Sequence, residues 1–185
     1  MILAIAVPIG LVVGTLLGGS IDNLITVRLR WPWLAVAGLA FQVVLFTQAG
    51  ANLAGAAAPA LYVASTAAVF VAVLRNLRVR GMSIVAAGAL LNLVAIIANA
   101  GVMPTTAAAL AAAGLETPGT NTNSAVLANP ALGPLTDVYA IPAGVPFANV
   151  FSIGDVLIAV GIVVVVAVAM RQSRWPGARP EVRPS

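Results

Sequence analysis

The stretch SIGDVLIAVGIVVVVAVAM, Ser152–Met170, decides the fold of this chain, because it is nearly all apolar and an arginine follows it directly. A bilayer's hydrocarbon core of about 30 Å requires about 20 residues of helix to cross it. Its apolar residues are continuous rather than alternating, which favours a helix over a strand of a β-barrel. The sequence therefore predicts a transmembrane helix here.

Four further apolar runs of similar length precede this stretch: Ile2–Ser20, Trp33–Gly50, Ala58–Arg75 and Met82–Ala100. The whole chain is 61% hydrophobic and 8% charged, with a mean hydropathy of +1.07. Such a composition cannot supply the charged surface of a water-soluble protein. We predict a single-domain, all-α integral membrane protein with five transmembrane helices, and we expect the first to be retained, because it lacks the basic start of a signal peptide.

The basic residues give this predicted bundle an orientation. All nine are arginines, and they follow the first, third and fifth apolar runs: Arg28, Arg30, Arg75, Arg78, Arg80, Arg171, Arg174, Arg179 and Arg183. Basic residues near span ends stay on the cytoplasmic side. We therefore expect an outside N-terminus, a cytoplasmic tail at residues 171–185, and a location in the bacterial inner membrane. The arginines would face anionic lipid headgroups rather than nucleic acid.

Residue types that the chain lacks restrict its chemistry. There is no Cys, no His and no Lys. Thiolate catalysis, imidazole-ligated metals and Schiff-base chemistry are therefore excluded within this chain. No pair of carboxylates is close enough in sequence to suggest general acid–base catalysis. We predict that the protein is not an enzyme and has no cofactor and no metal site.

Residues 103–150 form a long connection, which the arginine pattern places outside the cell. Thr105 or Thr106 can cap a short alanine-rich helix that ends at Gly114. Residues 116–124 are polar and without periodicity, and the proline-rich residues 129–147 suit an irregular apolar flap rather than a folded domain. Within this flap, Asp137 has the sequence context of a turn residue.

Glycines spaced four residues apart mark one face of the first run. Gly10, Gly14 and Gly18 permit close backbone approach, on which helix association in lipid depends. Gly88 and Gly161 are small-residue partners for this face. The pattern predicts helix packing, either within the chain or at a subunit interface.

Few polar side chains lie within the predicted spans. An amide in hydrocarbon needs a partner, so Gln42 and Asn92 should face inward and bond each other or a backbone carbonyl. The alternative is contact with a ligand such as a quinone headgroup. Together with Asn99 and Asp155 they form our candidate polar site.

Ser152 and Asp155 stand at the start of the fifth span. Their spacing suits a capping arrangement, with the serine accepting from a first-turn amide and the aspartate placing negative charge at the helix N-terminus. The alternative is a functional acid at the outer membrane surface.

Several short motifs resemble one protein family. They are residues 27–34, VRLRWPWL, with Gln42 after them; residues 99–104, NAGVMP; and residues 151–158, FSIGDVLI. The chain resembles the small bacterial membrane proteins grouped as domain of unknown function 5317 over nearly its whole length. The resemblance implies a multi-span protein with an enlarged outer loop and no assigned activity. Many members carry histidine in that loop, but Asn121–Ser124 occupies this region here, so no metal site is carried over.

Two functions fit these features. The first is a non-catalytic accessory or assembly subunit of a larger bacterial membrane complex, such as an energy-transducing one. The second is a small transporter or lipid-handling protein, in which Gln42, Asn92, Asn99 and Asp155 would line a cavity closed by the outer loop.

Overall fold

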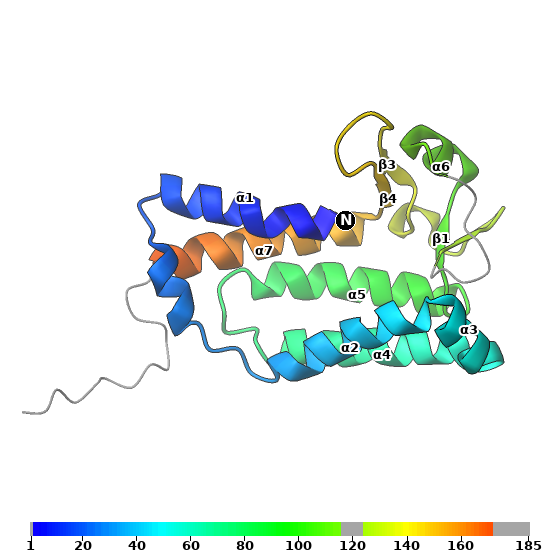
Figure 1. Ribbon diagram of the computed structural model, residues 1–185, viewed down its shortest axis with the longest axis horizontal. Helices are drawn as coiled ribbons and strands as arrows, with labels where there is room; N and C mark the ends of the chain where they lie inside the picture. The colour runs from blue at the N-terminus through cyan, green and yellow to red at the C-terminus, as the bar shows by residue number, and fades with distance from the viewer. Residues whose placement is uncertain (1, 116–123, 172–185) are drawn as a thin grey trace, which may run out of the picture.

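The computed structural model describes residues 2–115 and 124–171, and most of them are helical. Five helices have fourteen or more residues: α1 (Ile2–Leu16), α2 (Pro32–Leu45), α4 (Ala58–Leu74), α5 (Met82–Ala98) and α7 (Ile153–Arg171). They run side by side along the long axis of the molecule (Figure 1). Two helical stretches, Gln48–Leu74 and Ile153–Arg171, are long and apolar enough to cross a membrane by length and composition.

Each of the five predicted apolar segments coincides with one of these helices to within a few residues, but the first two helices end earlier than predicted. α1 stops at Leu16, and Gly18 follows it with a φ of +77°. α2 stops at Leu45 rather than at residue 50, and α3 (Gln48–Ala54) begins after a break. Thr47 causes this break, because its Oγ1 donates to Val44 O and accepts from Gly50 N, which caps the new helix.

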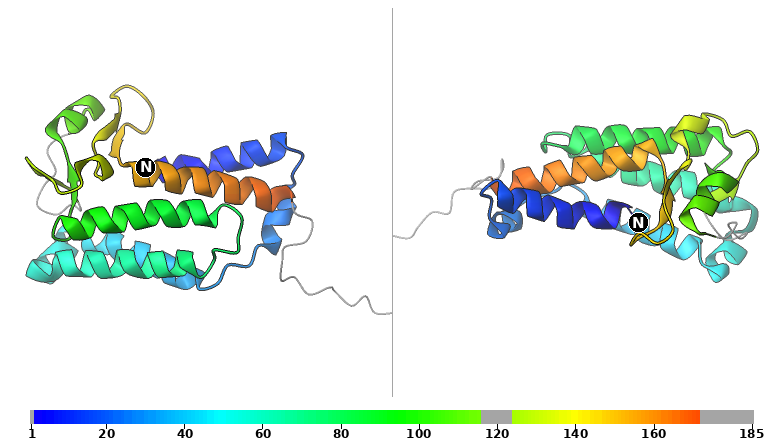
Figure 2. Two further views of the ribbon diagram at one scale, coloured as in Figure 1. Left: turned by 180° about the vertical axis from the view of Figure 1, so that it is seen from behind. Right: turned by 90° about the horizontal axis from the view of Figure 1, so that it is seen from above.

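The helices form two groups that meet along α5. α7 packs between α1 and α5, while α2 packs against α4 and α4 packs against α5. The views in Figures 1 and 2 agree that α1 and α2 lie at opposite edges of the bundle. α2 is the more exposed of these outer helices, with only Gly38 and Leu45 buried.

The long connection between α5 and α7 folds into a cap of short elements, which we define as residues 103–115 and 124–151. They are β1 (Met103–Thr105), α6 (Ala107–Ala113), β2 (Ser124–Val126), the 3-10 helix η3 (Gly133–Leu135), β3 (Tyr139–Ile141) and β4 (Asn149–Phe151). β1 pairs with β2 in parallel, and β3 pairs with β4 in antiparallel. Within the expected irregular flap, residues 129–147, the regular elements are η3 and β3 alone, and the other described residues form turns, bends and irregular backbone. The segment is therefore irregular over most of its length, and one short strand pairs with β4.

One part of the cap was predicted correctly, and another lies outside the described residues. Thr106 Oγ1 accepts from Ala109 N at 3.1 Å, and Gly114 ends α6 with a φ of +65°. The polar segment predicted for residues 116–124 falls on residues 116–123 except for its last residue, which begins β2, and most of the predicted cytoplasmic tail falls on residues 172–185. Neither range is among the residues that the structure describes.

The cap is attached to the helix ends by an apolar cluster and by one amide. Met103 of β1 is buried together with Leu45, Tyr62, Ala95 and Ile96 from three helices. Beside this cluster, Asn99 connects the end of α5 to residue 131 of the cap through two hydrogen bonds. The cap is therefore packed onto the bundle and not merely connected to it.

At the opposite end of the bundle, side chains fasten the connection before α2 to the turn after α4. Asn76 accepts from Arg30 N at 2.7 Å and donates to Arg30 O at 2.8 Å. The Arg75 guanidinium lies 4.3 Å from the ring centroid of Trp31. Asn23 Nδ2 donates to Met170 O at the end of α7. This bond places Arg171, the next residue, at the same end of the bundle as Arg30 and Arg75.

Candidate functional site

The start of α7 carries a reciprocal cap built from two side chains. Ser152 Oγ accepts from Asp155 N at 3.0 Å, and Asp155 Oδ2 accepts from Ser152 N at 3.3 Å. Each side chain thus satisfies an amide that the first turn of a helix leaves without a partner. Ser152 is 0% exposed, whereas Asp155 is only partly buried.

Asn92 of α5 joins this pair, and the three residues form what we call the Asn92 cluster: Asn92, Ser152 and Asp155. Asn92 Nδ2 donates to Asp155 Oδ1 at 2.8 Å, and Asn92 Oδ1 accepts from Ser152 Oγ at 2.9 Å. Both carboxylate oxygens of Asp155 and the hydroxyl of Ser152 are engaged. The cluster is therefore a polar clamp between α5 and α7, without a free nucleophile or base.

Glycines allow α5 and α7 to approach closely enough for this clamp. A Cβ atom at Gly154 would overlap Asn92 Oδ1, and one at Gly88 would overlap the carbonyl oxygen of Gly154. Farther along the same interface, a Cβ at Gly161 would lie 2.7 Å from Val85 N. Gly88 and Gly161 thus pack α5 against α7 rather than serving the glycine face of α1.

The glycine face of α1 lies against α7. A Cβ at Gly10 would lie 2.8 Å from Val166 Cβ, and one at Gly14 would overlap the Met170 sulfur. Gly18 has no neighbour within 4 Å, because it lies beyond the end of the helix. Two of the three predicted packing glycines are therefore used in a contact within the chain, and the third is not.

Gln42 and Asn92 do not bond each other as the sequence suggested. Gln42 Nε2 donates to Thr66 Oγ1 at 3.3 Å, across the interface of α2 and α4. Thr66 Oγ1 in turn donates to Tyr62 O at 2.9 Å. The order of helices in the bundle explains the difference, since α4 is adjacent to α2 and α7 is adjacent to α5.

Asn99 serves the cap and not a ligand cavity. Its Nδ2 donates to Ala95 O at 2.8 Å and to Ala131 O at 2.9 Å, and its Oδ1 accepts from Ala131 N at 2.9 Å. The four residues of the candidate polar site are therefore divided among three separate contacts. Only Asn92 and Asp155 meet.

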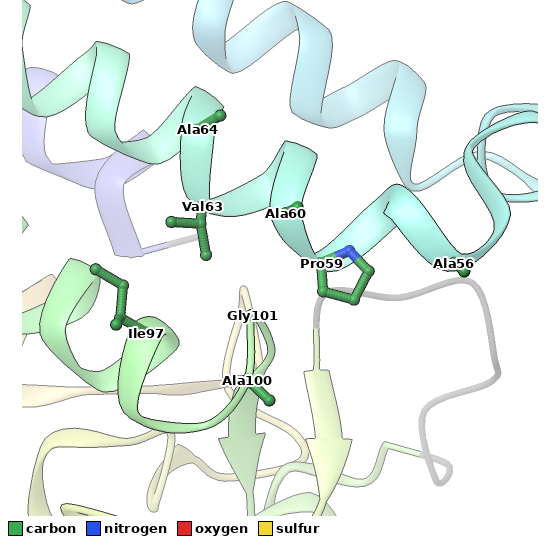
Figure 3. A pocket seen from close by; sticks show the side chains of 8 residues that line it. All are labelled: Ala56, Pro59, Ala60, Val63, Ala64, Ile97, Ala100 and Gly101. Atoms are coloured by element: carbon green, nitrogen blue, oxygen red, sulfur yellow. The ribbon is translucent and has the colours of Figure 1, made fainter.

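An open apolar hollow lies beside the cap, where α4 and α5 meet. Its volume is about 490 Å³. Figure 3 shows the side chains around it, which are Ala56, Pro59, Ala60, Val63, Ala64, Ile97, Ala100 and Gly101. None of the predicted polar residues lines this hollow, so its lining suits an apolar group and offers no chemistry.

Asp137 is a residue whose environment sequence reasoning missed. It is 9% exposed, and its Oδ1 has no hydrogen-bond partner among the described residues. Burial, reinforced by the charge of Asp155, raises the pKa of Asp137 to about 7, and the amino-terminal charge acts in the opposite direction. The only sequence signal was an acid within an apolar, proline-rich segment, which is equally typical of an exposed turn.

Within residues 2–115 and 124–171, no three His, Cys, Asp or Glu side chains gather in a group that could hold a metal ion. Comparison with family models gives one finding: a model described as a family of unknown function (DUF5317) matches residues 26–167, well over half of the chain. Comparison with curated proteins and with solved structures gives no match.

Proposed function

Since this chain belongs to DUF5317, a family of unknown function, we propose a function from its own residues: it is a non-catalytic accessory or assembly subunit of a larger bacterial membrane complex. In this proposal all five long helices cross the inner membrane, with the N-terminus outside and the C-terminal tail in the cytoplasm. No enzymatic step is assigned to it.

The clustering of positive charge supports this topology. Six arginines lie in segments joined at the end of the bundle opposite the cap: Arg28, Arg30, Arg75, Arg78, Arg80 and Arg171. Such an end suits anionic headgroups of the cytoplasmic leaflet. A reporter enzyme fused after the last residue should be active only as a cytoplasmic fusion. Activity restricted to the other side of the membrane contradicts the topology.

The observation that carries the subunit proposal is the uncovered apolar face of α2. Six large apolar side chains are exposed on this helix: Trp33, Val36, Leu39, Phe41, Val43 and Val44. The polar side chains that could have bound a ligand are engaged in hydrogen bonds inside the chain instead. In a membrane, tight packing of such a face against another helix is a source of association energy.

Site-specific photocrosslinking tests this proposal. A photoreactive residue at Val43, which is 71% exposed on α2, should form an adduct with a different polypeptide in native membranes. The matched control is Val12 of α1, which is 59% exposed and lies at the opposite edge of the bundle. Adducts with lipid alone at both positions would contradict the subunit proposal.

The hollow beside the cap favours the second candidate function, the handling of a lipid or another hydrophobic ligand. Its all-apolar lining and its volume of about 490 Å³ suit part of an acyl chain. Under this alternative, added fatty acid raises the melting temperature of the protein. The substitution Ala60→Phe fills the hollow and should abolish this rise, whereas Leu61→Phe, one residue away and outside the lining, should retain it.

A further inference from the structure

Asp137 is fixed inside the cap, beside β1 and shortly after η3, the element that contacts the helix ends. Its N–H donates to Pro104 O at 2.9 Å, and its carbonyl oxygen accepts from Thr105 Oγ1 at 2.9 Å. It also forms a parallel bridge with Thr105, which is 0% exposed. The neighbouring element η3 packs against both α5 and α7. The buried Oδ1 of Asp137 therefore gains full access to water only when the segment of the cap that contains Asp137 separates from β1.

The surroundings of this carboxyl group favour its neutral form. Its Oδ1 is buried and accepts no hydrogen bond from a described residue. β1, η3 and α5 contain no ionisable side chain, and α7 presents the carboxylate of Asp155. The remaining ionisable side chain on β3, Tyr139, stacks on Phe151 at 5.7 Å. Of the charges that act on Asp137, only that of the amino terminus favours ionisation.

We propose that Asp137 is a proton-binding site whose protonated form keeps the segment from η3 to Asp137 docked on β1 and on the ends of α5 and α7. Ionisation places an unpaired charge in a buried position, near the negative charge of Asp155. The charge is relieved when the segment around Asp137 leaves β1 and meets water. The cap thus responds to the pH on its own side of the bundle, and this inference does not depend on the proposed subunit function.

The direction of the pH effect follows from the shift. The pKa of Asp137 is raised in the folded state from 3.8 to about 7, so the folded state holds more protons than the unfolded state between these values. The stabilisation is complete below about pH 4 and is lost as the pH rises through about 7. The cap should therefore be most firmly docked in acid and should loosen toward pH 8.

A single cysteine can report this opening, because the chain has no cysteine of its own. Met103→Cys places the thiol in the buried cluster where β1 meets the helices. The full-length protein in detergent is labelled with a maleimide from pH 5.5 to 8, both alone and combined with Asp137→Asn. The ratio of the two rates at each pH cancels the ionisation of the thiol itself.

The proposal expects this ratio to rise severalfold between pH 5.5 and pH 8, because only the protein with Asp137 opens as the pH rises. A ratio that stays constant over the whole range overturns it, whatever the value of that constant.

Thermal unfolding provides a second measurement that needs no cysteine. The melting temperature of the unsubstituted protein should fall from pH 5.5 to pH 8 by more than that of Asp137→Asn. The control Asp22→Asn removes an exposed carboxylate in the first turn of η1 (Ile21–Thr26), far from the cap, and should keep the full fall. Equal pH dependence in the unsubstituted protein and in Asp137→Asn would overturn the proposal independently of the labelling result.

Discussion

The α5–α7 and α2–α4 interfaces use the same two devices, a glycine and an amide side chain, with different results. Between α5 and α7, Gly88 and Gly154 bring the helix backbones together, and Asn92 bonds Asp155 at 2.8 Å. Between α2 and α4, a Cβ at Gly38 would meet the side chain of Val69, and the Gln42 bond to Thr66 is 3.3 Å long.

The two interfaces also differ in how far neighbouring helices bury α7 and α2. α7 has neighbours on two sides, and its buried residues extend over its length: Gly154, Gly161, Ala167, Ala169 and Met170. α2 packs mainly against α4 and leaves its other face exposed. α7 is therefore packed on two sides, whereas α2 is packed mainly on one.

The largest expected effect comes from adding one methyl group to each interface, which tests whether the α5–α7 interface is the more tightly packed of the two. In Gly154→Ala the new Cβ overlaps Asn92 Oδ1 and lies 2.8 Å from Gly88 O, so the helices must separate. We expect a loss of at least about 1–3 kcal/mol of stability, measured as a drop in the thermal unfolding midpoint in detergent. In Gly38→Ala the new Cβ lies 2.7 Å from Val69 Cγ2 and 3.2 Å from Ser65 O, a smaller overlap than at Gly154, and the change should cost less. Equal losses would contradict the distinction between the two interfaces.

Removal of the α5 amide should give the next largest effect. Asn92→Leu leaves the buried Ser152 hydroxyl without its acceptor and Asp155 Oδ1 without its donor. Leaving a buried polar group unpaired costs about 1–3 kcal/mol. The control is Asn52→Leu on the exposed surface of α3, for which about 0.5 kcal/mol or less is expected. An unfolding midpoint for Asn92→Leu that equals the control's would show that the clamp does not stabilise the fold.

The matching amide of α2 should matter less. Gln42→Leu removes the donor to Thr66 Oγ1, but that hydroxyl keeps its own bond to Tyr62 O. Nothing buried is therefore left unsatisfied, and the expected cost is about 0.6 kcal/mol, the average for hydrogen bonds between membrane helices. The same unfolding assay applies. A loss as large as that of Asn92→Leu would mean that α2 is bound as tightly as α7.

The sequence predicted the positions of the long helices well, because apolar run length sets helix position when few polar residues interrupt it. The caps at Thr106 and at Ser152 were also predictable, since capping depends on residues within one turn. The pairing of amides was not predictable. The helices are apolar on every side, so their patterns do not show which face meets which neighbour.

Two further features required the three-dimensional fold. The break between α2 and α3 depends on Thr47, one of three polar residues in a run that otherwise appeared continuously apolar. The burial of Asp137 depends on β1, which lies about thirty residues earlier in the chain and covers it. A local sequence window contains neither fact, which is why this acid resembled a turn residue.

The smallest expected change in stability comes from Asp155→Asn, which also tests whether the Asn92 cluster influences the cap. Asp155→Asn should preserve the start of α7, because the amide oxygen can still accept from Ser152 N, at a cost of about 0.3–1 kcal/mol. It also removes the negative charge that, after burial, contributes to raising the pKa of Asp137. The pH at which the cap opens should therefore move to a lower value, while burial keeps it above 3.8, the ordinary pKa of an aspartate. Labelling of Met103→Cys across pH measures this midpoint, with Asp22→Asn as a variant that should leave it in place. A midpoint that stays fixed or rises in Asp155→Asn would show that the charge of Asp155 does not influence the opening of the cap.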